Sequence, residues 1–432
     1  MPHATILGAG LAGLAAAQRL GRAGYDVAIY ERNAYAGGHA ASHHARGFVF
    51  DEGPHVSFTT NPEIQALLAE SVKGEYVEQH ATILNYYRGL WIKHPVQTNL
   101  HGLPPPLVRD AIVDFVAAQS DDAAPPATYA EWCRRHLGRT LSEAFVFPYT
   151  RKYWTTDASN MSVDWVGARV YRPTLQEVLD GALAPFAGGH HYLQTFRYPI
   201  RGGFASYVHG IAEGVDVDFD HDVVEIDLAR RTLAFANGRR TLFERLVSSL
   251  PLPVLIGLIT NAPREVRAAA DGLSCTSLVL VNVGVEHPGR LDAHWIYVYD
   301  EDVAFARASF PHKLSEHNVP PGCSSVQAEV YHSKYRPLPC ADVVGRVVDD
   351  LRRTGVIDAG DRIVVASEQR IPYANVLFDL DRSRHLAVVQ AWLARMGVAC
   401  CGRYGEWEYY WTDDSILSGW RAAERVMEGR KP

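Results

Sequence analysis

The sequence predicts an α/β fold with a Rossmann-like nucleotide-binding domain, a second domain built on an antiparallel sheet, and a helical insertion. Three observations support this prediction. A βαβ unit with a glycine-rich turn opens the chain, a proline-punctuated segment with helical patterns follows, and strand-like segments gather between residues 275 and 335. The length of 432 residues suits two or three domains.

The βαβ unit comes first. An apolar strand over residues 4–7 leads into the turn 8–13, and a helix rich in alanine and leucine is predicted over residues 11–23. A second strand over residues 26–30 ends beside Glu31. The glycine-rich turn therefore stands in the strand–turn–helix context that dinucleotide binding requires.

Each glycine of this turn has a predicted task. Gly8 permits the tight turn, Gly10 lets the backbone approach a pyrophosphate, and Gly13 lets the helix pack closely on the sheet. The helix N-terminus offers N–H groups to the phosphates. Glu31 is expected to accept hydrogen bonds from ribose hydroxyls and to repel a 2′-phosphate, which favours FAD or NAD over NADP.

The next residues separate FAD from NAD. Glu31 is followed by the pair Gly37-Gly38, and the chain here resembles the FAD-dependent, amine-oxidase-like superfamily, whose members place a paired glycine near the flavin. The turn Gly53-Pro54-His55 resembles that of UDP-galactopyranose mutases. The resemblance implies FAD as cofactor and His55 beside the flavin ring or the substrate. A turn histidine bonded to backbone explains the residue type equally well.

The helical insertion follows. Thr128 is a predicted helix N-cap, with Glu131 completing a capping box. The segment from Tyr149 to Trp154 resembles the Pro-Tyr-x-x-Lys-x-Trp stretch of the mutases, which implies that both aromatic residues line the substrate cavity. The alternative is an aromatic cluster that packs one helix on another.

A third motif points to another branch of the superfamily. The stretch from Tyr198 to Gly203 resembles the Tyr-Pro-x-x-Gly-Gly of protoporphyrinogen-oxidase-like and amine-oxidase-like proteins, and the mutases differ there. The strand that follows contains Val223 and Val224. In the relatives the backbone of this strand contacts the adenosine half of FAD.

The predicted antiparallel sheet contains strands over residues 278–285, 295–299, 304–309 and 326–331. Arg307 lies in the third of them. An arginine in a sheet that roofs a cavity can hold an anionic substrate, although a wet sheet face is the more common position for arginine.

The C-terminal segment resembles the last FAD-binding element of the superfamily, a Gly-Arg-x-Gly turn before a helix, which we expect from about Ile416. The resemblance places Arg403 and Tyr409 near the flavin and a substrate diphosphate. However, Trp411 stands where mutases usually carry an aspartate, and Glu408 where a basic residue is common.

These segments define the expected site. The residues expected to bind FAD are Gly8, Gly10, Leu11, Ala12, Gly13, Glu31, Arg32, Gly37, Gly38, His39, Gly53, Pro54, His55, Val223, Val224, Gly402, Arg403, Asp413, Asp414 and Ser415. Catalytic roles are expected for His55, Arg403 and Tyr409, and substrate binding for Tyr149, Trp154 and Arg307. We expect an FAD-binding domain in residues 1–100, 196–255 and 386–432, the insertion in 101–195, and the sheet domain in 256–385.

Composition and the absence of other motifs exclude several classes of function. A net charge of −7 argues against a nucleic-acid partner, no apolar stretch is long enough to span a bilayer, and unpaired cysteines favour the cytoplasm. No metal, nucleophile-elbow or P-loop motif is present. We therefore expect an FAD-dependent oxidoreductase that passes hydride from a small organic substrate to flavin N5. The alternatives are a reduced-FAD nucleotide-sugar mutase and a non-catalytic FAD-binding scaffold.

Overall fold

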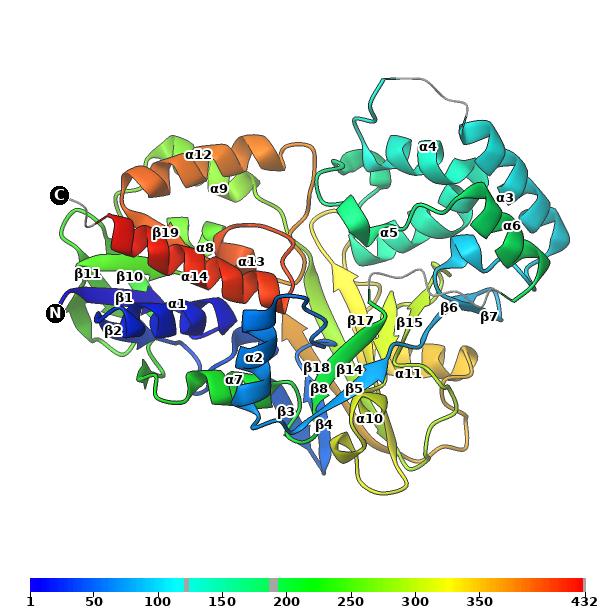
Figure 1. The fold of residues 1–432 in the computed structure, drawn as a ribbon, viewed down its shortest axis with the longest axis horizontal. Coiled ribbons are helices and arrows are strands. Elements are labelled where there is room, and N and C mark those ends of the chain that lie inside the picture. Colours follow the sequence, from blue (N-terminus) through cyan, green and yellow to red (C-terminus); the bar gives the residue numbers. More distant parts are fainter. Residues whose placement is uncertain (120–123, 186–192, 430–432) are drawn as a thin grey trace.

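The computed structural model describes residues 1–119, 124–185 and 193–429. A lobe around a parallel sheet contains both termini, a long twisted sheet fills the centre, and helices form the other lobe (Figure 1). The predicted fold class, an α/β protein with a Rossmann-like domain, a second sheet domain and a helical insertion, is confirmed.

The parallel sheet has five strands in the order β19 (Val398–Cys400), β13 (Arg245–Ser248), β1 (His3–Leu7), β2 (Asp26–Tyr30) and β9 (Val217–Asp218). All four neighbouring pairs are parallel. Helices α1 (Leu11–Arg22) and α14 (Thr412–Glu428) lie side by side along it (Figure 1). The first and last segments of the chain thus meet in one domain.

Glycines allow α1 to pack closely against the turn before it and against α14. A Cβ on Gly13 would stand 2.0 Å from the carbonyl oxygen of Gly8, and one on Gly419 of α14 would stand 2.2 Å from that of Ala12. Real Cβ contacts are never so short, so glycine is required at both positions. The predicted packing role of Gly13 follows directly from this geometry.

The central sheet has seven strands in the order β18 (Ile363–Ile371), β14 (Ser277–Val285), β17 (Ser324–His332), β16 (Arg307–Ser309), β15 (Trp295–Val298), β6 (Ile83–Tyr87) and β7 (Leu90–Lys93). Every pair is antiparallel except β15 with β6, which is parallel. Helix α11 (Val343–Arg353) packs against it.

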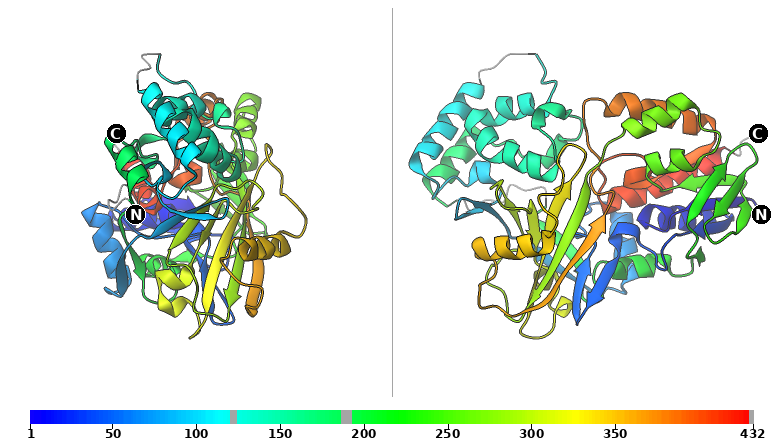
Figure 2. Two further views of the ribbon diagram at one scale, coloured as in Figure 1. Left: turned by 90° about the vertical axis from the view of Figure 1, so that its right-hand side faces the viewer. Right: turned by 180° about the vertical axis from the view of Figure 1, so that it is seen from behind.

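The structure places two segments beside other parts of the chain than the expected boundaries do. Residues 83–93 contain β6 and β7, and β6 pairs with β15 of the central sheet. Residues 252–272 form α8 (Leu252–Leu258) and α9 (Arg264–Gly272). Helix α8 packs on β10 (Val223–Asp227) and α9 on α12 (Arg382–Arg395), in the lobe of the parallel sheet (Figure 2).

The helical insertion contains α3 (Pro105–Ala118), α4 (Tyr129–Leu141), α5 (Phe147–Tyr153) and α6 (Leu175–Leu183). The Thr128 side chain caps α4 by accepting from the N–H of Glu131. The expected capping box is only half formed, because the Glu131 carboxylate accepts from the N–H of Ala127 instead.

Smaller elements join these parts. A three-stranded sheet contains β10 (Val223–Asp227), β11 (Thr232–Phe235) and β12 (Arg240–Leu242). Two further antiparallel pairs are the hairpin of β3 (Ser42–Ala45) with β4 (Phe48–Asp51) and the long-range pair of β5 (Tyr76–His80) with β8 (Thr195–Pro199). The remaining helices are α2 (Pro62–Ser71), α7 (Ala205–Ala212), α10 (Pro311–Leu314) and α13 (Gly402–Gly405).

Candidate active site

The turn between β1 and α1 has the geometry of a phosphate cradle. Gly8 has a φ of +96°, which favours glycine, and Gly10 is the N-cap of α1 without any side-chain cap. Gly37 forms a β-bridge with Gly10, and its N–H donates to the carbonyl of Ala9 (2.8 Å). The nearest atom to a Cβ on Gly10 would be 3.9 Å away, so the glycine leaves open space beside free helical N–H groups.

Glu31 is held firmly at the end of β2. Its buried carboxylate accepts from the N–H of Ala9 and of Asn33, each at 2.9 Å. Each carboxylate oxygen retains a further lone pair, so ribose hydroxyls can still donate to it. The neighbouring Arg32 side chain is exposed. These features suit the ribose of a dinucleotide.

Val223 and Val224 begin β10 close to Glu31, because the N–H of His221 donates to the Glu31 carbonyl (2.8 Å). Val223 pairs with Phe235, but a bulge leaves Val224 out of the ladder. The backbone of Val224 is therefore available to a ligand, as the resemblance implied for the adenosine half of FAD.

The start of α14 forms the opposite wall. Trp411 is its N-cap and its N–H donates to the Asp414 carboxylate (3.0 Å), while the Ser415 hydroxyl donates to the Trp411 carbonyl (2.9 Å). Helix α14 thus begins four residues earlier than expected, because the Asp414 carboxylate accepts a hydrogen bond from the N-cap residue and so stabilises the first turn. Asp413 lies in the same turn.

Arg403 precedes this helix. Its Nε donates to the carbonyl of Tyr410 (2.8 Å) and its Nη1 to that of Ala374 (3.2 Å). A Cβ on Gly402 would lie 3.0 Å from the Ala12 side chain, so the turn sits directly against α1. The C-terminal turn and the N-terminal cradle therefore face one cofactor site, and the residues present fit FAD.

His55 lies between these walls. Its Nε2–H donates to the carbonyl of His39 (2.7 Å), which leaves Nδ1 as an acceptor. Burial and the positive charge of Arg403 lower the pKa of His55 to about 4. The side chain is therefore neutral at physiological pH, and its backbone contact agrees with the alternative role considered from sequence.

A cavity lined with aromatic rings lies between the helical insertion and the central sheet. The hydroxyl groups of Tyr153 and Tyr409 are 3.0 Å apart, and the rings of Trp154 and Tyr409 are in edge contact at 5.0 Å. The aromatic lining residues are Tyr129, Tyr149, Tyr153, Trp154, Trp165, Tyr171, Tyr297, Tyr299, Tyr409 and Trp411. The structure thus brings Tyr149, Trp154 and Tyr409 together.

The arginines differ in how their charges are balanced. Arg307 lines the cavity, but it is paired with the fully buried Glu329 (Nη2 to Oε1, 2.8 Å). The two residues are directly opposite on β16 and β17. Its expected role as a free anion anchor is therefore weakened, because the sheet already neutralises it.

Arg169 was missed in the sequence. Its Nη2 donates to the carbonyl of Tyr409 (2.8 Å), and its guanidinium lies over the rings of Tyr409 and Trp411, at 5.0 and 4.5 Å. Its buried Nε–H and the indole N–H of Trp165 both lack a hydrogen-bond partner. Both residues line one cavity whose described lining contains no carboxylate.

One signal could have found this pair. Trp165 and Arg169 are four residues apart, and tryptophan is rare, with nine in the chain. The segment contains only a short 3-10 turn, so no helical or strand periodicity marked it.

The oxidase-like motif has a structural role instead. The Tyr198 hydroxyl donates to the buried Asp51 carboxylate (2.7 Å), and so does the N–H of Phe204 (2.9 Å). A Cβ on Gly203 would stand 2.7 Å from the same carboxylate. Burial raises the pKa of Asp51. The motif thus fastens β8 to β4 and does not face the aromatic cavity.

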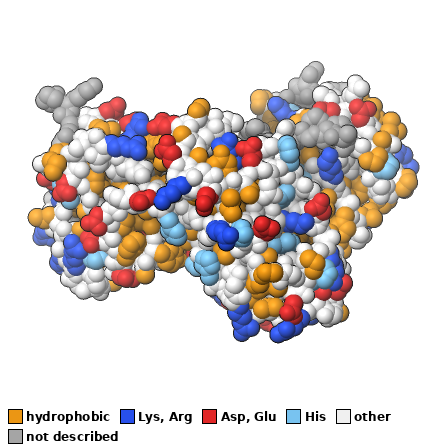
Figure 3. All heavy atoms as spheres, turned by 60° about the horizontal axis from the view of Figure 1, so that its bottom comes forward, with side chains coloured by type: hydrophobic (Ala, Val, Ile, Leu, Met, Phe, Trp, Pro, Cys, Tyr) orange, Lys and Arg blue, Asp and Glu red, His pale blue; other side chains and the backbone are white. Residues whose placement is uncertain are grey.

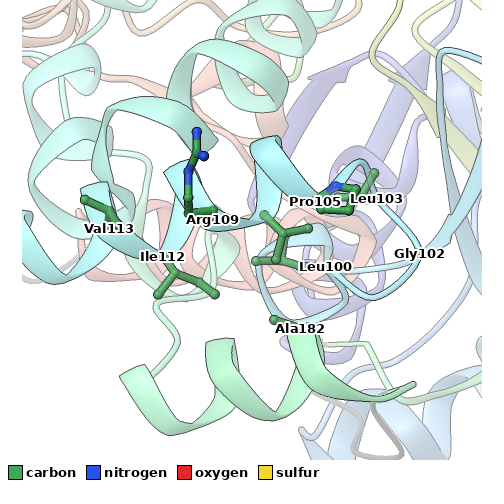
Figure 4. Close-up of a pocket in the computed structure, with 9 residues that line it drawn as sticks. Leu100, Gly102, Leu103, Pro105, Arg109, Ile112, Val113 and Ala182 are labelled. Carbon is green, nitrogen blue, oxygen red and sulfur yellow. The ribbon is translucent and has the colours of Figure 1, made fainter.

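A second hollow lies on the helical insertion. Figure 4 shows Leu100, Ile112 and Ala182 turned toward the space between α3 and α6, while the Arg109 guanidinium points away. Arg109 is exposed and paired with Asp110. On the face seen in Figure 3, basic and acidic side chains are interspersed. In the described part of the chain, no helix is long and apolar enough to cross a bilayer.

The chain is similar to several known proteins. The family model described as flavin containing amine oxidoreductase matches residues 11–427. The solved structure of a reduced UDP-galactopyranose mutase aligns with a TM-score of 0.94 and 26% identity over 100% of this chain and 97% of that one. A putative protoporphyrinogen oxidase from Exiguobacterium sp. 255-15 aligns with a TM-score of 0.77 and 16% identity, covering 99% of both chains.

A curated relative matches only locally. The 4,4'-diaponeurosporene oxygenase of Staphylococcus aureus (strain Mu50 / ATCC 700699) is 42% identical over 71 residues, which is 16% of this chain and 14% of the relative. The match therefore spans about a seventh of that protein's length.

Proposed function

We propose that this chain, which belongs to the family of flavin containing amine oxidoreductases and is an FAD-dependent enzyme, is a mutase that rearranges the sugar ring of a nucleotide sugar. The observation that carries this proposal is the guanidinium of Arg169, which lines a cavity without a carboxylate in its described lining and has no ion pair among the described residues. An anionic diphosphate would pair with this charge. The whole-length likeness to the solved mutase supports the same choice.

The charge of the cavity disfavours amine oxidation. Among the described residues no ion pair neutralises Arg169 or Arg403, whereas Arg307 is matched by Glu329. A protonated amine would meet the positive charge of Arg169, which lines the cavity and has Asp414 as a nearby carboxylate, in a partly buried site where Coulomb repulsion is stronger than in water. The intact Tyr198–Gly203 motif no longer favours an oxidase, because Tyr198 and Gly203 contact Asp51 of β4 and do not line the aromatic cavity.

Each part of the cavity has a task in this proposal. When bound, FAD supplies a two-electron carrier and, once reduced, a nucleophile. Arg169 and Trp165 hold the diphosphate, and the aromatic faces of Trp154 and Tyr409 exclude water and stack on the ring systems of the substrate. Tyr153 and Tyr409, joined by their hydroxyl groups, fix the orientation of that end of the cavity.

A direct assay tests the proposal. FAD-loaded protein is reduced anaerobically with dithionite and incubated with UDP-galactofuranose, and the six-membered ring isomer is measured by chromatography. We expect conversion by the reduced protein and none by the oxidised protein. Consumption of a substrate with reduction of FAD, and no ring isomer, would contradict the mutase proposal.

Variants link the activity to the cavity. Arg169→Gln removes the guanidinium with its contacts to Tyr409 and Trp411, and Trp165→Phe removes the indole N–H. We expect about a tenfold rise in KM from a lost charge-assisted or buried hydrogen bond. Arg151→Gln is the matched control. Arg151 is paired with Glu301 at the surface (Nη2 to Oε2, 2.7 Å) and does not line the cavity, so its KM should not change.

The second candidate is hydride transfer from a flat organic substrate. The large share of aromatic rings in the lining favours it, since stacked rings bind planar apolar molecules well. Oxygen uptake without ring isomerisation distinguishes this reaction from the first.

A further inference from the structure

A buried carboxylate beside the FAD turn is shared by two histidines. The Glu52 side chain is 8% exposed, and its oxygens accept from His39 Nδ1 (3.0 Å), His43 Nε2 (2.9 Å) and Gln369 Nε2 (2.8 Å). Within the described residues, its ion pairs are with these two histidines, without lysine or arginine. The charge of the cluster therefore depends on whether the histidines are protonated.

His39 stands between the two walls of the cofactor site. It directly follows the paired glycines that bridge to Gly10, and its carbonyl accepts from His55 (2.7 Å). Its ring is in edge contact with Tyr404, at 5.4 Å, next to Arg403. His43 lies on β3 with its side chain 39% exposed, so the carboxylate connects a cofactor-side histidine to a solvent-accessible one.

A carboxylate that accepts a hydrogen bond from a neutral histidine fixes the tautomer of the imidazole ring. When Nδ1 of His39 donates to Glu52, its hydrogen is on Nδ1 and Nε2 is left as an acceptor. The same carboxylate raises the pKa of His43, and the two histidines hold the pKa of Glu52 at about 2. The Tyr35 hydroxyl, Asp51, His55, Tyr404 and Arg403 are the other titratable or charged groups that face the cluster.

We infer that Glu52 is a positioning residue of the FAD turn, which fixes the Nδ1–H form of His39 and connects it to the partly exposed His43, so that the charge of the cluster beside FAD changes when His43 is protonated. Glu52 and His43 together carry one negative charge when His43 is neutral and no net charge when it is protonated. Acidification therefore adds positive charge near the pyrophosphate, and FAD binding tightens as the pH falls. This inference concerns the cofactor turn and does not depend on the proposed substrate.

Two measurements test it, neither of which requires turnover. Nitrogen-15 NMR of histidine-labelled, FAD-loaded protein should show His39 protonated on Nδ1, with the signal assigned by its loss in His39→Gln. The Kd for FAD, followed by flavin fluorescence, should fall about tenfold from about pH 8.5 to about pH 6.

Glu52→Gln removes the charge that raises the pKa of His43. The midpoint of the Kd curve should move down by about one pH unit or more in this variant. Tyr35→Phe is the matched control, because it removes a neutral donor to the same carboxylate (3.3 Å) and should leave the midpoint unchanged.

An Nε2–H form of His39 in the unmodified protein, or an unchanged midpoint in Glu52→Gln, would overturn the inference. If Glu52→Gln does not fold, His43→Gln replaces it, since His43 is partly exposed. That variant should bind FAD with a flatter dependence on pH, and the full wild-type dependence would be contradictory.

Discussion

At the scale of single residues, glycine and buried charge decide what this site can do. Gly13 leaves room for a carbonyl, Gly10 leaves room for a ligand, and Glu31 is held in place by two backbone N–H groups. Arg169 is held by a carbonyl and by aromatic faces, so its charge stays available to an anion.

Two glycines of helix α1, Gly13 and Gly21, differ in the space around them. Gly13→Ala places a Cβ 2.0 Å from the Gly8 carbonyl oxygen, so we expect a loss of about 1–3 kcal/mol in unfolding free energy from overpacking. We also expect weaker FAD binding, because the cradle must shift. Thermal denaturation and flavin retention on gel filtration measure both effects.

Gly21→Ala is the control, because a Cβ there meets nothing within 4 Å. In the same helix it should gain about 0.5–1 kcal/mol. Equal losses in the two variants would contradict the packing account of Gly13.

The sequence was most informative where the signal is local. The cradle from Gly8 to Gly13 and Glu31 were predicted from a few adjacent residues. The neutralisation of Arg307 by Glu329 was not, because it depends on the register of two strands. Trp165 and Arg169 were missed because the segment that carries them has no regular period.

At the scale of elements, most predicted strands and helices are present, and the errors arise where distant segments meet. Strand β6 pairs in parallel with β15, a pairing between segments far apart in the chain that no local pattern announces. Helix α14 begins early because the Asp414 side chain caps its first turn. The turn before this helix is also stabilised by Arg382 of α12.

Arg382 fastens that turn. Its Nε donates to the Trp407 carbonyl (3.1 Å), its Nη2 pairs with Glu408 (2.6 Å), and its guanidinium stacks on Phe378 at 4.0 Å. Arg382→Gln removes the buried hydrogen bond to the Trp407 carbonyl and an ion pair whose Glu408 side chain is 36% exposed, so we expect a loss of about 1–2 kcal/mol in unfolding free energy. Because the turn carries Arg403, FAD affinity should fall as well.

Urea denaturation and FAD titration check this prediction. Arg384→Gln in the same helix is the control, since its exposed pair with Asp381 should contribute less than about 0.5 kcal/mol. A stable Arg382→Gln protein with normal FAD affinity would show that the C-terminal turn keeps its structure without Arg382.

At the scale of the whole molecule, buried polar contacts tie the parts together. Lys152 of α5 is buried, and its Nζ donates to the carbonyls of Val298 (3.0 Å) and Asp300 (2.8 Å), which joins the helical insertion to β15. His294 precedes β15, accepts from the N–H of Thr82 (3.0 Å) and contacts Gln79 (3.0 Å). Such contacts make the assembly sensitive to pH.

Three buried histidines predict acid sensitivity. Burial lowers the pKa of His55, His294 and His312 to about 4 each, below the ordinary value of 6.5. The unfolded chain therefore binds more protons between these values, and stability is lost as the pH falls through this window. At about pH 5.5 each histidine should cost about 1 kcal/mol.

His294→Asn isolates one of these contributions. Its amide oxygen can still accept from the N–H of Thr82, but it does not titrate. The difference in unfolding free energy between about pH 7.5 and about pH 5.5 should shrink by about 1 kcal/mol in the variant. Denaturant unfolding at both pH values gives this difference, and an unchanged value would rule out His294 as a source of acid sensitivity.

The order of the parallel sheet also has a consequence for biosynthesis. Its edge strand β19 and the covering helix α14 follow the central sheet in the chain, yet they pack against β13 and α1. Domains generally fold as units. This cofactor site therefore needs segments from both sides of the central sheet, so that it forms only after β19 and α14 have been synthesised, and flavin colour reports that these segments have joined β13 and α1.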